Sequence, residues 1–85
     1  MQVAMLSGME IRHGGPVPVW KQVADDIAQR IKAGEFHQDD AIPSQTAMRQ
    51  EYGIAIMTAR RVIRDLQERG LVYTVTGRGS YVRGR

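Results

Sequence analysis

Apolar side chains recur at three- and four-residue spacing in the stretch that begins near Val19, and this period constrains the fold more than any other feature. The recurring positions are Trp20, Val23, Ala24, Ile27, Ala28 and Ile31. Polar residues occupy the positions between them, so the pattern predicts an amphipathic helix with one buried face. Gly34 follows and suits the left-handed cap that ends many helices. Other elements must cover the apolar side of this helix.

Two more helices are predicted after the polar loop 35–42. Ser44 is a good N-cap for a helix of about eight residues that stops at Gly53. After the turn at Gly53-Ile54, a third helix is expected to run to Gly70. One of its faces is apolar, with Ala59, Val62, Ile63 and Leu66, and the other carries Met57, Arg60, Arg61 and Arg64.

Two short runs rich in β-branched and aromatic residues follow the third helix. They are 71–75 and 80–82, joined by the Gly-containing segment 76–79, and they predict a β-hairpin. Ile42 precedes Pro43 and is expected to be extended, as a short strand. The predicted fold class is therefore mainly α with a small β-hairpin, in the order of a winged helix-turn-helix with three helices and a wing.

The chain length predicts one small domain. Single domains usually have about 100 to 150 residues, and this chain has 85. We expect a flexible lead-in at 1–18, the domain at 19–82, and a tail or the start of a linker at 83–85.

The core uses most apolar residues, so no small-molecule effector is expected to bind this chain. No window has about 18 uninterrupted apolar residues, so no membrane partner is expected.

Positive charge gathers in the second half of the sequence. From Arg49 onward eight arginines stand against three acidic residues, whereas the residues before Arg49 hold four cations and six acids. Ten of the twelve cations are arginines, whose planar guanidinium suits phosphate and guanine. This charge distribution favours a polyanionic partner.

Catalytic and metal chemistry have little support in the sequence. The chain has no Cys and two His, which excludes thiolate nucleophiles and Cys-bearing zinc sites. His13 lies in the predicted lead-in, and no second ligand pair near His37, Asp39 and Asp40 has the spacing of a zinc site. No Ser-His-Asp arrangement is plausible, and no phosphate-binding Gly loop opens a helix. We therefore expect no enzyme, no catalytic residue, no metal and no cofactor.

Four segments, in this order, resemble the GntR family of bacterial transcriptional regulators and its HutC-like branch. They are PVWKQVADDIAQRIKAG at 18–34, IPSQTAMRQEYGI at 42–54, MTARRVIRDL at 57–66 and GRGSYV at 77–82. The resemblance implies a cytoplasmic regulator at the bacterial nucleoid, which we expect to be a repressor. It further implies sequence-specific binding to duplex DNA, at one half-site of an inverted-repeat operator. Full-length members are expected to be homodimers, and the isolated domain a monomer or weak dimer.

The same resemblance implies particular contacts with DNA. The third helix enters the major groove, where Thr58 and Arg60 touch the DNA, and Ser44 starts the second helix near a phosphate. The wing lies on the adjacent backbone or minor groove. The candidate DNA-binding residues are Ser44, Gln45, Thr46, Ile56, Met57, Thr58, Arg60, Arg61, Arg64, Gly77, Arg78 and Gly79.

The sequence departs from the family pattern at two places. Gln45 and Thr46 follow Pro-Ser where the family typically has Glu, often followed by Arg. Ala55 and Ile56 stand where Ser and Arg usually open the third helix. The missing cap is expected to cost about 1 kcal/mol of stability, and a missing guanine contact about 1 to 3 kcal/mol at one base pair. Ile56 either packs on thymine methyl groups with Met57 or is partly buried against the second helix.

The sequence leaves the roles of two arginines open. Arg61 and Arg64 either clamp phosphates or are solvated and paired with Asp65 or Glu68. The aromatic and apolar residues Trp20, Tyr52, Leu71 and Tyr81 are expected in the core.

A protein-interaction module without DNA binding is the competing function, and exposed apolar residues on the third helix would favour it. Single-stranded RNA binding is disfavoured because no aromatic platform is expected on the hairpin.

Overall fold

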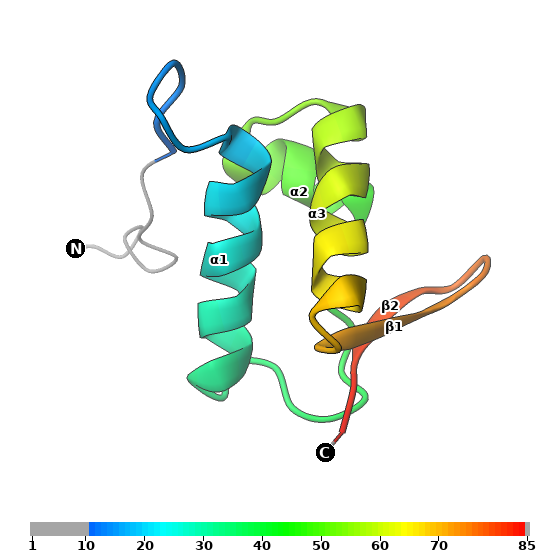
Figure 1. Cartoon of the computed structure of the whole chain (residues 1–85). Coiled ribbons are helices and arrows are strands. Elements are labelled where there is room, and N and C mark those ends of the chain that lie inside the picture. The colour runs from blue at the N-terminus through cyan, green and yellow to red at the C-terminus, as the bar shows by residue number, and fades with distance from the viewer. Residues whose placement is uncertain (1–10, 85) are drawn as a thin grey trace.

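The computed structural model describes residues 11–84 and contains three helices and one hairpin (Figure 1). In chain order the elements are α1 (Val19–Lys32), α2 (Gln45–Tyr52), α3 (Ile56–Glu68), β1 (Val72–Val75) and β2 (Gly79–Val82). Figure 1 shows α1 beside α3, with α2 behind them and the hairpin extending away from the helices. The predicted order of elements is confirmed, and strand boundaries differ from the prediction by one residue. The first ten residues of the predicted lead-in and Arg85 of the predicted tail lie outside the described residues.

Local signals at the two ends of α2 act as the sequence predicts. The Ser44 hydroxyl accepts a hydrogen bond from the Ala47 amide at 3.0 Å. At the other end Gly53 adopts a left-handed conformation with φ +67° and ψ +37°. A side chain at this position would be strained, so Gly53 permits the tight turn between α2 and α3.

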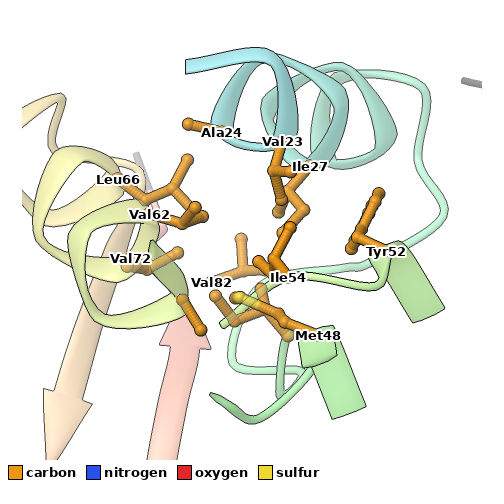
Figure 2. Close-up of a cluster of buried hydrophobic side chains, with 12 residues drawn as sticks. Val23, Ala24, Ile27, Met48, Tyr52, Ile54, Val62, Leu66, Val72 and Val82 are labelled. Carbon is orange, nitrogen blue, oxygen red and sulfur yellow. The ribbon is translucent and has the colours of Figure 1, made fainter. Parts of the chain in front are cut away.

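All elements contribute to one hydrophobic core (Figure 2). Its members are Val23, Ala24, Ile27, Ile42, Met48, Tyr52, Ile54, Ala59, Val62, Leu66, Val72 and Val82. Trp20 and Leu71 are half-buried and pack against its edge. The expected core position is therefore confirmed for Tyr52, while Trp20 and Leu71 lie at the edge of the core and Tyr81 is half-buried on the hairpin outside this cluster.

The hairpin is tied to the loop that precedes α2. Its antiparallel register pairs Val72 with Val82 and Val75 with Gly79. Ala41 forms an isolated bridge with Tyr81, and the Ile42 amide donates to the Ser80 carbonyl at 3.0 Å. The expected extended segment before Pro43 thus pairs with β2. As a result, the start of α2 is held next to the hairpin.

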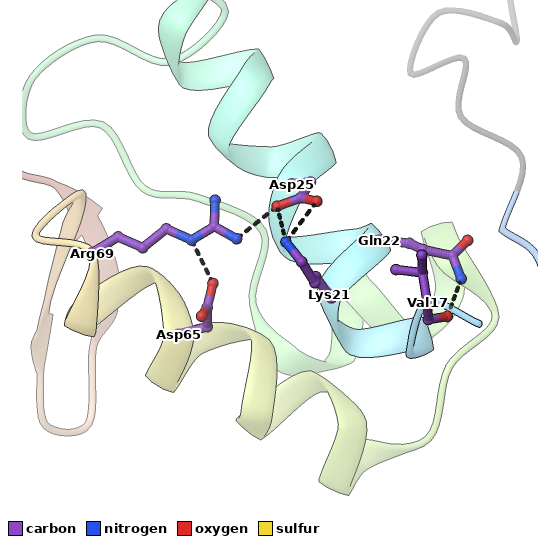
Figure 3. A network of polar contacts seen from close by, with 6 residues as sticks. All are labelled: Val17, Lys21, Gln22, Asp25, Asp65 and Arg69. Atoms are coloured by element: carbon purple, nitrogen blue, oxygen red, sulfur yellow. Dashed lines mark hydrogen bonds and ion pairs between the residues drawn. The ribbon is translucent and has the colours of Figure 1, made fainter.

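A polar network joins α1 to the end of α3 (Figure 3). Arg69 contacts Asp25 on α1 and Asp65 on α3, each at 2.6 Å. The hydrogen bond from Arg69 lowers the pKa of Asp25 below its ordinary value. About one turn before Asp25, near the start of α1, the Gln22 amide donates to the Val17 carbonyl at 2.9 Å. This side chain anchors the segment before α1, a contact that sequence periodicity did not predict.

Candidate nucleic-acid interface

An open groove of about 560 Å³ lies between α3, the start of α2 and the hairpin. We call it the wing groove, and most of the predicted site residues line it. From α2, α3 and the hairpin in turn, they are Ser44, Gln45, Thr46, Arg60, Arg64, Gly77, Arg78 and Gly79. The fold therefore joins three segments that are distant in sequence into one continuous surface.

The other four predicted residues lie on α3 outside the wing groove. Ile56 and Thr58 are half-buried, whereas the Met57 side chain is 66% exposed. Arg61 is exposed, and its guanidinium carbon lies 4.3 Å from the centre of the Trp20 ring on α1. The arginines of α3 are thus divided between two flanks. A single exposed Met among them is not the contiguous apolar patch that a protein-docking face would need.

The arginines of α2, α3 and the wing form no ion pair with a carboxylate in the described part of the chain. Among residues 11–84, no ion pair involves Arg49, Arg60, Arg61, Arg64 or Arg78. Asp65, a candidate partner of Arg61 or Arg64 on the sequence, pairs instead with Arg69. The positive charge around the wing groove is therefore uncompensated within the described chain, which favours attraction of a polyanion.

The start of α2 presents backbone donors to the wing groove. Ser44 caps the Ala47 amide, and the Ser44 carbonyl accepts from the Met48 amide at 2.8 Å. Within residues 11–84 the amides of Gln45 and Thr46 have no such partner. Free amides at a helix start carry partial positive charge and can bind an oxygen anion.

The wing ends in a tight turn with Arg78 exposed near its tip. The Arg78 amide donates to the Val75 carbonyl at 2.9 Å, and Gly77 has φ +79°. Because L side chains rarely adopt this conformation, glycine is needed at position 77. The tip is correspondingly slim, and its backbone can approach another surface closely.

The sequence did not predict the polar contacts that brace α2 against α1. The Tyr52 hydroxyl accepts a hydrogen bond from Arg30 and donates one to Asp26, each at 2.7 Å. Arg30 also contacts Glu51 at 2.8 Å. Burial, together with the bond to Asp26, raises the pKa of Tyr52 and keeps the phenol neutral. These contacts join α2 to α1 through polar side chains.

The expectation that the hairpin lacks an aromatic platform is wrong. Tyr73 and Tyr81 are stacked across the strands, with ring centroids 5.7 Å apart. They are opposite each other in the register, which places both side chains on the same face. The Tyr73 hydroxyl also donates to the Asp39 carboxylate at 2.8 Å. The sequence shows both tyrosines but does not show that they stack, because the stack forms only when the two strands pair.

Two negative findings concern the part of the chain that the structure describes. No helix in 11–84 is long and apolar enough to cross a membrane. In the same residues, no three His, Asp or Glu side chains come together as a metal site would require.

Comparison with known proteins identifies the family. The family described as "Bacterial regulatory proteins, gntR family" matches residues 20–82, which include all of the helices and strands except Val19. The chain belongs to the GntR family. This membership confirms the resemblance on which the candidate contacts are based.

Several GntR-type relatives resemble the chain over most of its length. The mannosyl-D-glycerate transport/metabolism system repressor MngR of Escherichia coli (strain K12) is 35% identical over 69 residues, which are 81% of this chain and 29% of the relative. NagR of Bacillus subtilis (strain 168), a transcriptional repressor, is 34% identical over 74 residues, or 87% of this chain and 30% of the relative. The histidine utilization repressor of Klebsiella aerogenes is 31% identical, covering 79% of this chain and 28% of the relative, in agreement with the HutC-like branch. The chain therefore spans less than a third of these relatives.

Solved GntR-type structures confirm the winged helix-turn-helix. AraR(DBD), crystallised in complex with operator ORX1, superposes with a TM-score of 0.79 at 33% identity, covering 87% of this chain and 95% of that one. YtrA from Sulfolobus acidocaldarius, a GntR-family transcription factor, gives 0.78 at 27% identity, with 88% and 79% covered. The prediction of a regulator's DNA-binding domain rather than an enzyme is confirmed by this family membership.

The structure also bears on the departures from the GntR pattern. Ala55 is the N-cap of α3 and provides no side-chain hydrogen bond, so the predicted absence of a cap is confirmed. Ile54 is buried in the core. Ile56 is half-buried and is not a member of the core cluster. Part of this side chain is therefore accessible at the first turn of α3.

Proposed function

We propose that this chain binds duplex DNA sequence-specifically and serves a transcriptional repressor by reading one half-site of an inverted-repeat operator. The observation that carries the proposal is the wing groove. There, Arg60, Arg64 and Arg78 form no ion pair within residues 11–84, and they line the groove together with the α2 start, whose first amides are free in the same residues. Such a surface matches the regular phosphates of a duplex.

In the proposed complex, α3 is the recognition helix in the major groove. A helix is about 10 to 12 Å across with its side chains, and the major groove is about 12 Å wide. Arg60 and Thr58 reach base edges, while Arg61 and Arg64 contact phosphates on the two sides of the helix. Gln45 and Thr46, with Ser44, bring the start of α2 to the backbone.

The wing completes this complex beside the recognition helix. Arg78 and the flanking Gly77 and Gly79 contact the adjacent backbone or minor groove. One domain covers one half-site, so the isolated domain acts as a monomer or weak dimer, and the inverted repeat requires two copies. We assign the protein to the bacterial nucleoid in the cytoplasm. We propose that no small-molecule effector binds this chain.

A salt titration tests the proposal. Duplexes selected from a random pool should bind with an affinity that falls as salt rises, with a log–log slope of about −0.9 for each phosphate contacted. The same strands unpaired should bind more weakly. Arg64→Gln should make the slope about 0.9 shallower, whereas the matched control Lys32→Gln should not change it. Lys32 is an exposed cation near the end of α1, outside the wing groove.

Two outcomes would contradict DNA binding. Affinity that barely changes with salt would mean that phosphates are not the ligand, and would support the protein-interaction alternative. A preference for unpaired strands would direct attention to the stacked Tyr73 and Tyr81.

A further inference from the structure

A short chain of side-chain hydrogen bonds connects α3 to both strands of the wing. The Gln67 amide donates to the Thr74 hydroxyl at 2.6 Å. The Thr74 and Ser80 hydroxyl oxygens lie 2.8 Å apart. Because Thr74 accepts from Gln67, its own proton is free to be donated to Ser80. We call these three residues the wing relay.

The wing relay lies where it can control the reach of the wing. Thr74 and Ser80 face each other in the register, one step below the pair Val75 and Gly79 that borders the tip. All three relay residues line the wing groove together with Arg64 and Arg78. The relay therefore links α3 to the wing along the lining of the groove.

The hairpin needs such a constraint for its direction. An isolated two-stranded hairpin is marginally stable in water, so contacts with a neighbouring element must set its direction. Backbone hydrogen bonds tie β2 to the loop before α2. Towards the core, Val72 and Val82 bury the base of the hairpin, but apolar packing does not fix its angle to α3 because it is not directional. Hydrogen bonds depend steeply on distance and angle. The relay is thus suited to fix the angle between β1 and α3.

We propose that Gln67 and Thr74 are positioning residues that hold the wing at the angle from which Arg78 reaches DNA while α3 occupies the major groove. This inference rests on the proposed function. Neither residue carries a charge, and the proposed role requires no contact with DNA. Losing the relay should therefore remove the Arg78 contact even though Arg78 itself is retained.

The test on DNA uses Thr74→Val, which removes the hydroxyl at nearly constant shape. Arg78→Ala alone should make the salt slope about 0.9 shallower. Thr74→Val should make it shallower by a similar amount although no charge is lost, and should weaken binding about three- to tenfold. In the Thr74→Val background, Arg78→Ala should then add little. Thr74→Ser keeps a hydroxyl and should restore both slope and affinity.

A second measurement works without DNA. The chain has no Cys, so the double variant Thr76→Cys and Glu68→Cys places two spin labels specifically, one near the wing tip and one at the end of α3. We expect a narrow distance distribution in this background, a broader one after Thr74→Val or Gln67→Leu, and a narrow one after Thr74→Ser. Gln29→Leu, at an exposed glutamine on α1, is the matched control for Gln67→Leu.

The two measurements test the positioning role of the relay separately from the proposed DNA binding. If the chain does not bind duplex DNA but Thr74→Val still broadens the label distance distribution, the proposed function is overturned. The role of the relay in DNA binding is then overturned too, whereas its role in orienting the wing stands. An unchanged distance distribution after Thr74→Val would overturn the positioning role. So would weakened binding in which Arg78→Ala keeps its full effect, because that pattern means a general loss of stability. Melting temperatures of all variants identify that case.

Discussion

The guanidinium of Arg61 on α3 stacks over the indole of Trp20 on α1, with 4.3 Å between the guanidinium carbon and the ring centre. Arg64, one turn further along α3, lines the wing groove on the other flank. The sequence predicts the same alternative roles for both arginines, but their surroundings in the fold differ. Arg61 stacks on an aromatic ring, whereas Arg64 lies in the wing groove.

This difference predicts separable effects of two equivalent substitutions. Arg61→Gln should lower the free energy of unfolding by about 0.5 to 1 kcal/mol, because it removes an exposed cation–π contact. Among residues 11–84 Arg64 has no ring partner, so Arg64→Gln should leave stability nearly unchanged. Both should make the salt slope of DNA binding about 0.9 shallower. Urea unfolding and salt titration of the two variants provide the comparison, and equal stabilities would argue against an energetic role for the stacking.

Arg60 and Arg78 should differ in how they affect base preference. Arg60 lies on α3, the proposed recognition helix, so Arg60→Ala should weaken binding and relax the preference at one base position, at a cost of about 1 to 3 kcal/mol. Arg78→Ala should weaken binding to all duplexes more evenly, since we propose that the wing contacts the adjacent backbone or minor groove. Affinities for a panel of single-base variants of the selected site test this. If both substitutions have no effect, the DNA-facing surface has been assigned wrongly.

Ile56 stands where the family typically has a guanine-reading arginine, and it is only half-buried. If it faces the major groove, Ile56→Arg should raise affinity and shift the preferred base towards G by about 1 to 3 kcal/mol at one pair. If it is covered by α2, the new charge is stranded and the melting temperature should fall without a change in base preference. Measuring both quantities decides between the two. A stable variant with the original preference would show that position 56 does not read sequence.

The Tyr52 hydroxyl should contribute to stability through both of its charged partners. Tyr52→Phe removes the bonds to Arg30 and Asp26, and we expect the free energy of unfolding to fall by about 1.5 to 3 kcal/mol. Tyr73→Phe is the matched control, because its hydroxyl bonds Asp39 in an exposed setting and should matter less. Thermal and urea unfolding measure both. Similar losses in the two variants would mean that burial of the Tyr52 network adds nothing.

Acid should weaken the contacts that join α1 to its neighbours. The hydrogen bond from Arg69 lowers the pKa of Asp25, and the one from Arg30 lowers the pKa of Glu35. Carboxylates with a lowered pKa stabilise the fold above their unfolded values of about 3.9 and 4.3, and this stabilisation is lost as the pH falls through the folded values. The urea midpoint should therefore drop as the pH falls below about 4.

The variant Asp25→Asn should flatten that acid dependence, because it removes one of the titrating groups. Glu68→Gln changes an exposed carboxylate that forms no ion pair within residues 11–84, and it should keep the full dependence. If Asp25→Asn and the unmodified chain lose stability in parallel as the pH falls, the ion pair with Arg69 is not a source of the acid sensitivity.

The sequence by itself determined the order and limits of the elements. The apolar period sets which residues share a helix face, because side chains on a helix repeat every 3.6 residues. Ser44 and Gly53 mark the ends of α2 through local hydrogen bonding and backbone sterics, which need no distant partner. Motifs at the right spacing were sufficient to indicate the family, which the comparisons confirmed.

Only the tertiary structure decided what lies next to each face. Helical period places Arg61 and Arg64 on the same side of α3, but whether Trp20 or the wing lies beside them depends on how α1 and the hairpin pack. The pairing of Arg69 with Asp25, the bracing of Tyr52 and the wing relay likewise join residues from different elements. These contacts follow from packing many side chains into one core. No local period encodes them, because their partners are set by chain segments that meet only after folding.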